Sequence, residues 1–402
     1  MKITKRPSGG KPEKDAKELK PVDKIRILFD EHLPNVKRNE ITGEWEVDGR
    51  PLTEEDMNSH LLVFQSKFTG ISETLFWRYL KSNNITPYNP IHIFFKTRIE
   101  QKSKGKIKAL AESINTDTGF NDSEFNPNFV EHFLTKWLVG AVAQAHGKGV
   151  NPLMPVLAGT KQNTGKTTFF RNLLPKELMA YFAEPKGLSD MKDADLGMLL
   201  CENLICFDDE MSGRSWKDWQ KMKSMLSMSN YTMRRPYDKR QRKYPRIASL
   251  CATNNNLDML GDPTGNRRLI PINVLSIDHA AYNAVDKEAL WMEAYQLFKS
   301  GYDHNLNQAD IKMLNDCTKD FEVVDETVEL LQEYFEPPGD TSVGRMTATQ
   351  VTQVLMRNSS FKFIHPNKIG GCLKRMGYQQ RRDNANGSRT WVISILPQYR
   401  SP

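Results

Sequence analysis

The chain has few of the residues that cross-link small secreted folds. Its 402 residues include five cysteines, an odd number, and none of them forms a Cys-x-x-Cys pair. Cys206 and Cys251 lie inside apolar runs that are typical of buried strands. These observations exclude a disulfide framework and a cysteine zinc site, and they predict buried free thiols in a reducing compartment.

Long apolar runs are also missing. None approaches the ~20 residues that a membrane-spanning helix needs. The first residues, MKITKRPSGGKPEKDAKELK, are lysine-rich and have no apolar centre, unlike a secretory signal. We therefore expect a cytoplasmic protein with no membrane partner. The N-terminal region also shows no acidic triad or metal-binding cluster of the kind that marks a primase.

Acidic residues become scarce near the C-terminus. Asp383 is the only acid after Asp340, whereas ten lysines and arginines occur there. The whole chain carries a net charge of +7, which permits a nucleic-acid partner without requiring one.

The most informative stretch is GTKQNTGKTTFF, residues 159–170. A buried strand, MPVLAG, precedes it and a helix, TTFFRNLL, follows it. Backbone amides at such a junction favour phosphate, the lysine reaches the terminal phosphates, and the next hydroxyl binds Mg²⁺. The predicted ATP-binding residues are Gly159, Gln162, Asn163, Thr164, Gly165, Lys166, Thr167 and Thr168.

The spacing of this loop is unusual. Five residues separate Gly159 from Gly165, where the usual pattern has four. The amides that wrap phosphate lie closest to Gly165, so a wider turn after the strand can absorb the extra residue. An ordinary strand-to-helix turn is the alternative.

Two further strand ends supply the polar groups that hydrolysis needs. LICFDDE ends in Asp208, Asp209 and Glu210, which can orient the attacking water, and the two aspartates can complete a Mg²⁺ site with Thr167. Taken alone, these acids fit a solvated strand end equally well. SLCATNNN ends in asparagines that can place an amide near the γ-phosphate: Asn254, or Asn255, which we slightly favour.

The stretch GNRRLIPI places Arg267 and Arg268 between a glycine turn and a strand. Adjacent arginines are often only surface charges. In a ring-shaped ATPase, one such arginine reaches the nucleotide of the neighbouring subunit and stabilises transition-state charge.

Taken in order, these stretches resemble the virulence-associated E family, whose superfamily 3 helicase domains are encoded by phages, plasmids and pathogenicity islands. The resemblance spans roughly residues 87–334 and includes YNPIHIFF, KSMLSMSNYTMRRPY, YPRIASLCATN and LGDPTGNRRLIPI. Thr160 departs from it, because the family has glycine there. The resemblance implies an AAA+-like P-loop ATPase core that assembles as a ring, typically a hexamer, on DNA. The catalytic residues that it implies are Lys166, Asp208, Asp209, Glu210, Asn254 or Asn255, and Arg267 or Arg268.

Two basic regions are candidate DNA contacts. MRRPYDKRQRKYPR reads as a hairpin, and in the resembled helicases such an insert lines the central pore. Cations track phosphates and an aromatic ring stacks on a base. The candidates here are Arg234, Arg235, Tyr237, Lys239 and Arg240. A solvated charged hairpin is the alternative.

The second region is C-terminal. Its pattern of helix, helix and hairpin predicts a winged helix. Its candidate DNA contacts are Lys368, Lys374, Arg375, Arg381, Arg382 and Arg389. A structural or protein-binding winged helix remains open.

The expected fold class is α/β, with an α-rich N-terminal region, the ATPase core and a C-terminal winged helix. The expected boundaries are a disordered tail (1–22), an accessory or collar domain (23–125), the core (126–334), a linker (335–340) and the winged helix (341–402). A DNA helicase or replication initiator fits these features best. Three other functions stay open: an ATPase that remodels replication complexes or interferes with phage, a DNA-binding module with a decayed loop, and, least favoured, a small-molecule kinase.

Overall fold

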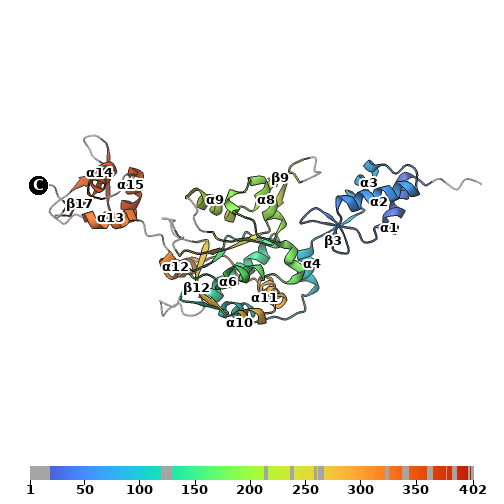
Figure 1. Cartoon of the computed structure of the whole chain (residues 1–402), viewed down its shortest axis with the longest axis horizontal. Coiled ribbons are helices and arrows are strands. Elements are labelled where there is room, and N and C mark those ends of the chain that lie inside the picture. Colours follow the sequence, from blue (N-terminus) through green and yellow to red (C-terminus); the bar gives the residue numbers. More distant parts are fainter. Residues whose placement is uncertain are drawn as a thin grey trace, which may run out of the picture.

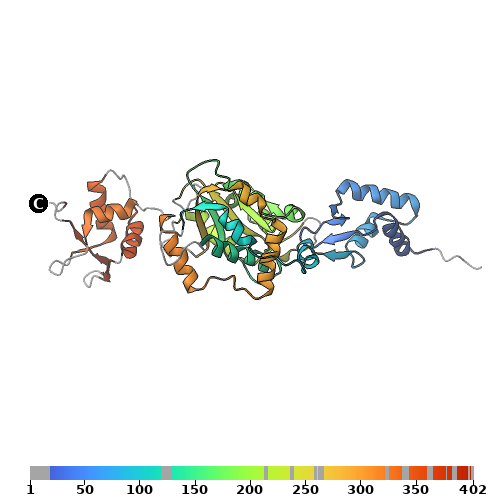
Figure 2. The ribbon, with the colours of Figure 1, turned by 90° about the horizontal axis from the view of Figure 1, so that it is seen from below.

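The computed structural model describes residues 19–118, 129–211, 216–235, 240–257, 260, 267–321, 326–336, 344–359, 365–376, 378–382, 387–396 and 399. Three compact units follow one another along the long axis, with the N-terminal unit at one end and the C-terminal unit at the other (Figures 1 and 2). The described part has the α/β class that the sequence predicted.

The N-terminal unit combines helices with a small sheet. Its sheet has the order β3-β2-β1-β4, in which β1 and β4 are parallel and the other pairs are antiparallel. Phe29, Phe64 and Phe76, one from each of the three helices, pack together as an aromatic core. Helices make up most of this unit's regular structure, and the small sheet completes it. Its elements are α1 (Pro21–His32), β1 (Lys37–Asn39), β2 (Trp45–Val47), β3 (Arg50–Pro51), α2 (Glu54–Lys67), α3 (Glu73–Leu80) and β4 (Thr86–Tyr88).

Helix starts in this unit follow from local sequence. Pro21 opens α1, at a position where its missing amide proton costs nothing. Thr53 and Asp56 form a capping box at the start of α2. The expected tail at 1–22 lies outside the described residues up to 18, and its last two residues already belong to α1.

The central unit is built on a six-stranded sheet with the order β5-β12-β6-β11-β8-β7. All neighbours are parallel except β5 and β12. Central strands are buried on both faces, which explains their nearly continuous apolar sequences. The strands are β5 (Ile114–Thr116), β6 (Met154–Ala158), β7 (Phe182–Ala183), β8 (Ile205–Asp208), β11 (Ser249–Asn254) and β12 (Leu269–Ile277).

Helices cover both faces of this sheet (Figure 1). α6, α10 and α11 lie on one face, and α8 and α9 lie on the other. A hairpin of β9 and β10 projects beside α8. The remaining elements are α4 (Pro90–Thr97), α5 (Lys106–Glu112), α6 (Phe129–Ala145), α7 (Lys166–Arg171), α8 (Asp193–Glu202), α9 (Trp216–Ser227), β9 (Asn230–Met233), β10 (Arg242–Pro245), α10 (His279–Ala284), α11 (Lys287–Lys299) and α12 (Gln308–Cys317), with 3₁₀ turns at Lys176–Tyr181, Leu188–Asp190 and Lys319–Phe321.

The core begins earlier in the chain than the expected boundary at residue 126. Ile91 and Phe94 of α4 and Ile107 of α5 belong to the same apolar cluster as α6. β5 also extends the central sheet by pairing with β12. The sequence interpretation placed these elements in the accessory domain, because it could not show that an edge strand crosses to a partner ~160 residues away.

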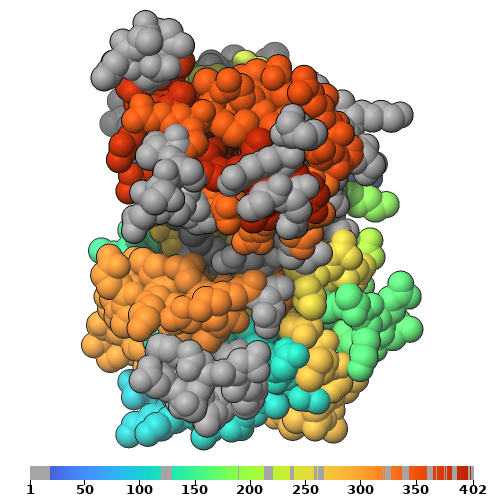
Figure 3. Space-filling model, turned by 90° about the vertical axis from the view of Figure 1, so that its left-hand side faces the viewer, coloured from blue at the N-terminus to red at the C-terminus, as the bar shows by residue number. Residues whose placement is uncertain are grey.

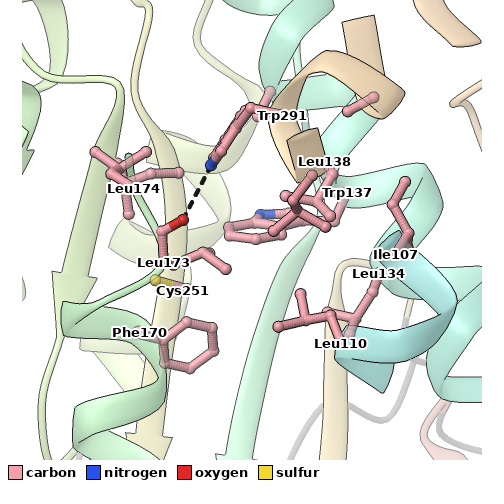
Figure 4. Close-up of a cluster of buried hydrophobic side chains, with 14 of the residues drawn as sticks. Ile107, Leu110, Leu134, Trp137, Leu138, Phe170, Leu173, Leu174, Cys251 and Trp291 are labelled. Atoms are coloured by element: carbon pink, nitrogen blue, oxygen red, sulfur yellow. Dashed lines mark hydrogen bonds between the residues drawn. The ribbon is translucent and has the colours of Figure 1, made fainter. Parts of the chain in front are cut away.

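A tryptophan pair anchors the helix that follows the glycine-rich loop. Trp291 of α11 donates its indole N–H to the carbonyl oxygen of Leu173 at 3.1 Å, just beyond α7 (Figure 4). Trp137 of α6 lies in the same cluster beside Phe170. The segment just after the C-terminal end of α7 is therefore hydrogen-bonded to the core.

The C-terminal unit has its own apolar cluster, which includes Leu331, Leu355, Leu373 and Trp391. Figure 3 shows the C-terminal unit in orange and red, nearest the viewer in the upper part of the view. Its sheets have the orders β14-β16-β15 and β13-β17. Its elements are α13 (Glu326–Tyr334), β13 (Phe335–Glu336), β14 (Arg345–Met346), α14 (Ala348–Asn358), α15 (Pro366–Arg375), β15 (Gln380–Arg382), β16 (Arg389–Val392) and β17 (Ser394–Ile395).

The expected linker at 335–340 is wrong in its first residues. Phe335 and Glu336 form β13 and pair with β17. α13, which we assigned to the core, contributes Leu331 to the C-terminal cluster. The reason is that the apolar face of α13 packs against α15 and α14 instead of the central sheet. The C-terminal unit therefore includes residues from 326 onward.

Candidate nucleotide and nucleic-acid site

The glycine-rich loop leaves β6 at the centre of the sheet. It starts at Gly159 with φ +148° and ends at Gly165 with φ +90°, two conformations that L-residues with side chains rarely adopt. The Gly159 amide donates to the carbonyl oxygen of Asn254 on β11 at 3.1 Å. A Cβ atom at Gly159 would lie 3.0 Å from the Val274 carbonyl oxygen on β12. Both neighbouring strands therefore fix where the loop begins.

Lys166 folds back into this loop. Its ammonium group donates to the carbonyl oxygens of Gly159 at 2.7 Å and Lys161 at 3.1 Å. The side chain is buried, and desolvation lowers the pKa of Lys166. A buried cation whose hydrogen bonds go to backbone carbonyl groups is suited to receive an anion.

The acidic strand end meets the loop directly. Thr167 donates its hydroxyl to Asp209 Oδ1 at 3.1 Å. Thr253 of β11 donates to the same oxygen at 2.5 Å. Arg171, at the last residue of α7, places Nη2 3.7 Å from Asp209 Oδ2. Residues from α7 and from the end of β11 therefore converge on the carboxylate that follows β8, as expected at the carboxyl edge of such a sheet.

Glu210 adopts a left-handed conformation, with φ +55°. Its amide donates to Thr253 Oγ1 at 3.0 Å, and its carboxylate accepts from Asn255 Nδ2 at 3.3 Å. A glutamate in this backbone region is uncommon and is often associated with a functional site. The neighbouring Asp208 is buried at the end of β8.

Asn254 and Asn255, the two candidates for placing an amide near the γ-phosphate, differ in burial. Asn254 is buried at the end of β11, and its Oδ1 accepts from the Asn256 amide at 3.0 Å. Asn255 is half-buried and oriented toward Glu210. Both lie beside the loop, because Asn254 pairs with Ala158 of β6.

The remaining loop residues divide by exposure. Gln162, Asn163 and Thr168 are exposed, whereas Thr164 is half-buried. The hydroxyl oxygen of Thr164 is itself buried and has no hydrogen-bond partner among the described residues. A buried hydroxyl group without a hydrogen-bond partner in this turn is consistent with a site that binds a polar ligand.

Arg267 and Arg268, the candidates to reach the nucleotide of a neighbouring subunit, lie away from the glycine-rich loop and Asp209. Arg268 donates to Ser227 Oγ of α9 at 3.1 Å, whereas Arg267 is exposed. Most of the preceding stretch, at 258–259 and 261–266, lies outside the described residues.

The basic hairpin has one face packed on the core and one face in solvent. Tyr231 and Met233 are buried, whereas Arg234, Arg240 and Lys243 are exposed. Tyr237 and Lys239, which we expected near its tip, lie outside the described residues.

Arg235 differs from the expectation of a free DNA contact. Its Nε lies 3.1 Å from Glu202 Oε1, and its guanidinium stacks over the Tyr244 ring at 4.3 Å. Its Nη2 also donates to the carbonyl oxygen of Ile41 in the N-terminal unit. Arg235 therefore joins the hairpin to the N-terminal unit.

The C-terminal cations mostly face solvent. Lys374, Arg381, Arg382 and Arg389 are exposed, and Arg382 lies opposite Arg389 on paired strands. Like charges in opposed positions repel each other, so an anion between them is favoured. Lys368 and Arg375 lie on α15, and their side chains are outside the described structure.

Sequence reasoning missed three residues that the structure places at the loop: Thr253, Arg171 and His279. Thr253 stands in the quoted run SLCATNNN, directly before the asparagines, and this was its only signal. Arg171 had no local signal, because it approaches Asp209 only through the packing of α7 against β8. His279 comes from a helix more than a hundred residues further along the chain.

Metal clusters, disulfides and membrane-spanning helices can be assessed for the residues that the structure describes. No cluster of three or more His, Cys, Asp or Glu side chains there has the arrangement of a metal site. All five cysteines are free thiols, as predicted. None of the described helices is both long and apolar enough to cross a membrane.

Comparison with known proteins gives one matching family and similar solved structures. The model of the virulence-associated protein E-like domain matches residues 100–323. Among solved structures, the chain is similar to the apo C-terminal region of NrS-1, with a TM-score of 0.52 and 11% identity over 94% of this chain and 100% of that one. Another crystal form of that region gives a TM-score of 0.50 with 10% identity over 92% and 98%. No curated protein sequence matches the chain.

Proposed function

The chain belongs to the family of virulence-associated protein E-like domains, and from this premise we propose that it is an ATP-driven motor that moves on single-stranded DNA. The process that it serves is replication of a phage or another mobile genetic element. In this proposal the central unit is an AAA+-like P-loop ATPase of superfamily 3, and the C-terminal unit is a winged helix.

One observation carries the proposal: Asp209 accepts hydrogen bonds from both Thr167 and Thr253. The loop after β6, the acidic end of β8 and the end of β11 therefore form one polar centre. These two hydrogen bonds distinguish Asp209 from an acid that contacts only solvent. Nucleoside triphosphate hydrolysis needs this combination of a phosphate loop, an acidic metal site and a polar sensor.

The residues present fit Mg²⁺ and ATP. Lys166 supplies the buried cation, and Thr164 supplies the unpartnered hydroxyl in the turn. Thr167, Asp208 and Asp209 offer the oxygen ligands that Mg²⁺ prefers. When bound, Mg²⁺ would neutralise the negative charge that develops on the phosphate oxygens.

The chain's own residues have separable roles. Lys166 withdraws from its two carbonyl partners to bind the terminal phosphates. Glu210 holds and orients the attacking water, and Asn255 fixes the Glu210 carboxylate through its amide. Arg171 places a positive charge 3.7 Å from Asp209 Oδ2, and the same guanidinium is held in position by Glu184.

A ring of subunits completes the proposed site. Arg267 is exposed and lies away from its own loop, whereas Arg268 binds Ser227 in the same chain. Of the two, Arg267 is therefore the better candidate to reach a neighbouring nucleotide. The exposed cations of the hairpin and of the C-terminal unit supply the proposed DNA contacts.

The first test is steady-state ATP hydrolysis with and without single-stranded DNA, for wild type and Lys166→Ala. We expect DNA to stimulate the wild type, and the variant to lose at least about a hundred-fold in rate because a transition-state cation is removed. Lys148→Ala, an exposed lysine of the same unit, is the matched control. Wild-type protein that binds DNA but hydrolyses no ATP at any concentration would instead support a DNA-binding module with a decayed loop.

A further inference from the structure

A histidine lies against the glycine-rich loop. His279 opens α10, directly after β12 and its cap residue Asp278. A Cβ atom at Gly165 would lie only 2.5 Å from His279 Cε1 and 2.9 Å from its Nε2. The imidazole therefore occupies the space beside the glycine that precedes Lys166, and its side chain is exposed.

α10 is fastened to the helix that follows the loop. Tyr282 donates its hydroxyl to the Phe169 carbonyl oxygen of α7 at 2.6 Å, and the two rings lie 5.0 Å apart. Lys287 donates to the carbonyl oxygens of Tyr282 at 2.7 Å and Val285 at 2.9 Å, at the end of α10. These contacts fix α10 at its far end, while Asp278 caps its start by accepting from the Ala281 amide at 3.0 Å. The position of His279 is therefore set by the fold.

The order of the strands shows which end of a nucleotide His279 faces. β11 and β8 lie on one side of β6, and β12 and β5 lie on the other. Asp209, Thr253 and Glu210 are all on the β11 and β8 side. A triphosphate whose terminal phosphate meets those residues runs across the loop amides toward β12. Its nucleoside then emerges on the side of β12 and α10, where His279 lies.

The geometry points to His279 as the residue that stacks on the base of the bound nucleotide. This inference rests on the proposed ATPase function and specifies the nucleoside end of the same site. An imidazole plane that is fixed at one edge and exposed at the other can cover the π-face of a base. Because every base has such a face, stacking by His279 alone favours no particular base.

The experiment compares ATP with inorganic tripolyphosphate, which has the phosphates but no nucleoside. Binding of each to the full chain is measured by isothermal titration calorimetry in the presence of Mg²⁺. We expect His279→Ala to weaken ATP binding about ten-fold, in line with the loss of one base–aromatic stack, and to leave tripolyphosphate binding unchanged. His279→Phe keeps a flat ring and is expected to restore ATP binding. His60→Ala, on α2 of the N-terminal unit, is the control.

Each other outcome is decisive. Equal weakening of both ligands would show that His279 shapes the loop or contacts phosphate, which overturns the inference. No weakening of ATP binding would overturn it as well. Wild type that binds neither ligand would overturn the proposed ATPase function and this inference together. Unchanged tripolyphosphate binding in His279→Ala also shows that the variant has folded with an intact loop.

Discussion

Among single residues, Arg246 is an arginine buried in the core. It is only 2% exposed, and its guanidinium donates to the Met225 carbonyl oxygen at 2.7 Å, to Gln144 Oε1 at 2.6 Å and to the Asn151 carbonyl oxygen at 2.8 Å. Burial lowers the pKa of Arg246 to about 10, so it stays charged at neutral pH. The residue joins α9, α6 and the segment before β6 at the foot of the basic hairpin.

Replacing Arg246 with methionine is expected to destabilise the central unit. Three buried hydrogen bonds from a charged donor are lost, and their loss lowers the free energy of unfolding by roughly 3 kcal/mol. Urea denaturation followed by circular dichroism measures the change. Arg242→Met removes an exposed arginine from β10 and is expected to change stability by less than about 0.5 kcal/mol. Equal stabilities of the two variants would contradict this account.

Among the elements, the β9–β10 hairpin has one face packed on the core and one face exposed to solvent. Tyr231 packs against α8, where a Cβ at Gly197 would lie 3.0 Å from the Tyr231 ring. On the other face, Lys243 stands opposite Thr232, and both are exposed. The period of two along a strand thus places Tyr231 and Met233 on one side and Lys243 on the other.

Charge removal from exposed positions of the hairpin is expected to weaken DNA binding without stopping the ATPase. In the triple variant Arg234→Gln, Arg240→Gln, Arg242→Gln, the salt dependence of single-stranded DNA affinity should fall by about 2 in slope, because each phosphate contact contributes ~0.7. Fluorescence anisotropy at several salt concentrations measures the slope. ATP hydrolysis without DNA should stay at the wild-type rate.

A variant with the same loss of charge elsewhere is the control for the hairpin. Lys102→Gln, Lys104→Gln, Lys108→Gln removes three exposed cations from the α5 region. Its salt slope should match that of the wild type. If both triple variants lower the slope equally, DNA binding reflects general charge and not the hairpin.

At the scale of the whole molecule, Arg235 contacts the N-terminal unit through the Ile41 carbonyl oxygen and is itself paired with Glu202 of α8. Asn39 of β1 also donates to the Tyr181 hydroxyl of the core at 2.9 Å, and Ile41 is buried in the core cluster. Burial raises the pKa of Glu202 to about 7, while Arg235 acts in the opposite direction. The ordinary value for a glutamate is 4.5.

This contact predicts a dependence on pH. Since the folded pKa of Glu202 exceeds the unfolded one, its contribution to stability is complete below about pH 4.5 and is lost as pH rises through about 7. Arg235→Met removes the cation that favours the charged form, so the pKa of Glu202 should rise further. The Tm of this variant should therefore fall further below that of the wild type at pH 8 than at pH 5.

Differential scanning fluorimetry across this pH range tests the prediction. The double variant Arg235→Met, Glu202→Gln removes the titrating group, so its Tm difference from a Glu202→Gln variant should not change with pH. A constant difference for Arg235→Met alone would show that the pair does not titrate as described.

Local patterns in the sequence were enough to predict several parts of this protein. The strand MPVLAG, the helix after Gly165, the buried strand LICFDDE and the basic hairpin all appear as expected, because each depends on neighbouring residues. The free cysteines followed from their number and their apolar surroundings. The family also followed from motif order.

Only the tertiary structure decided which distant residues meet at the site and where the units divide. Thr253 and His279 reach the loop because β11 and β12 flank β6, an order that no local spacing encodes. Arg235, which the sequence made a candidate DNA contact, is paired in the fold with Glu202 of α8. Contacts between strands and helices that are far apart in sequence arise from burial of shared apolar faces, and this burial is a property of the assembled fold.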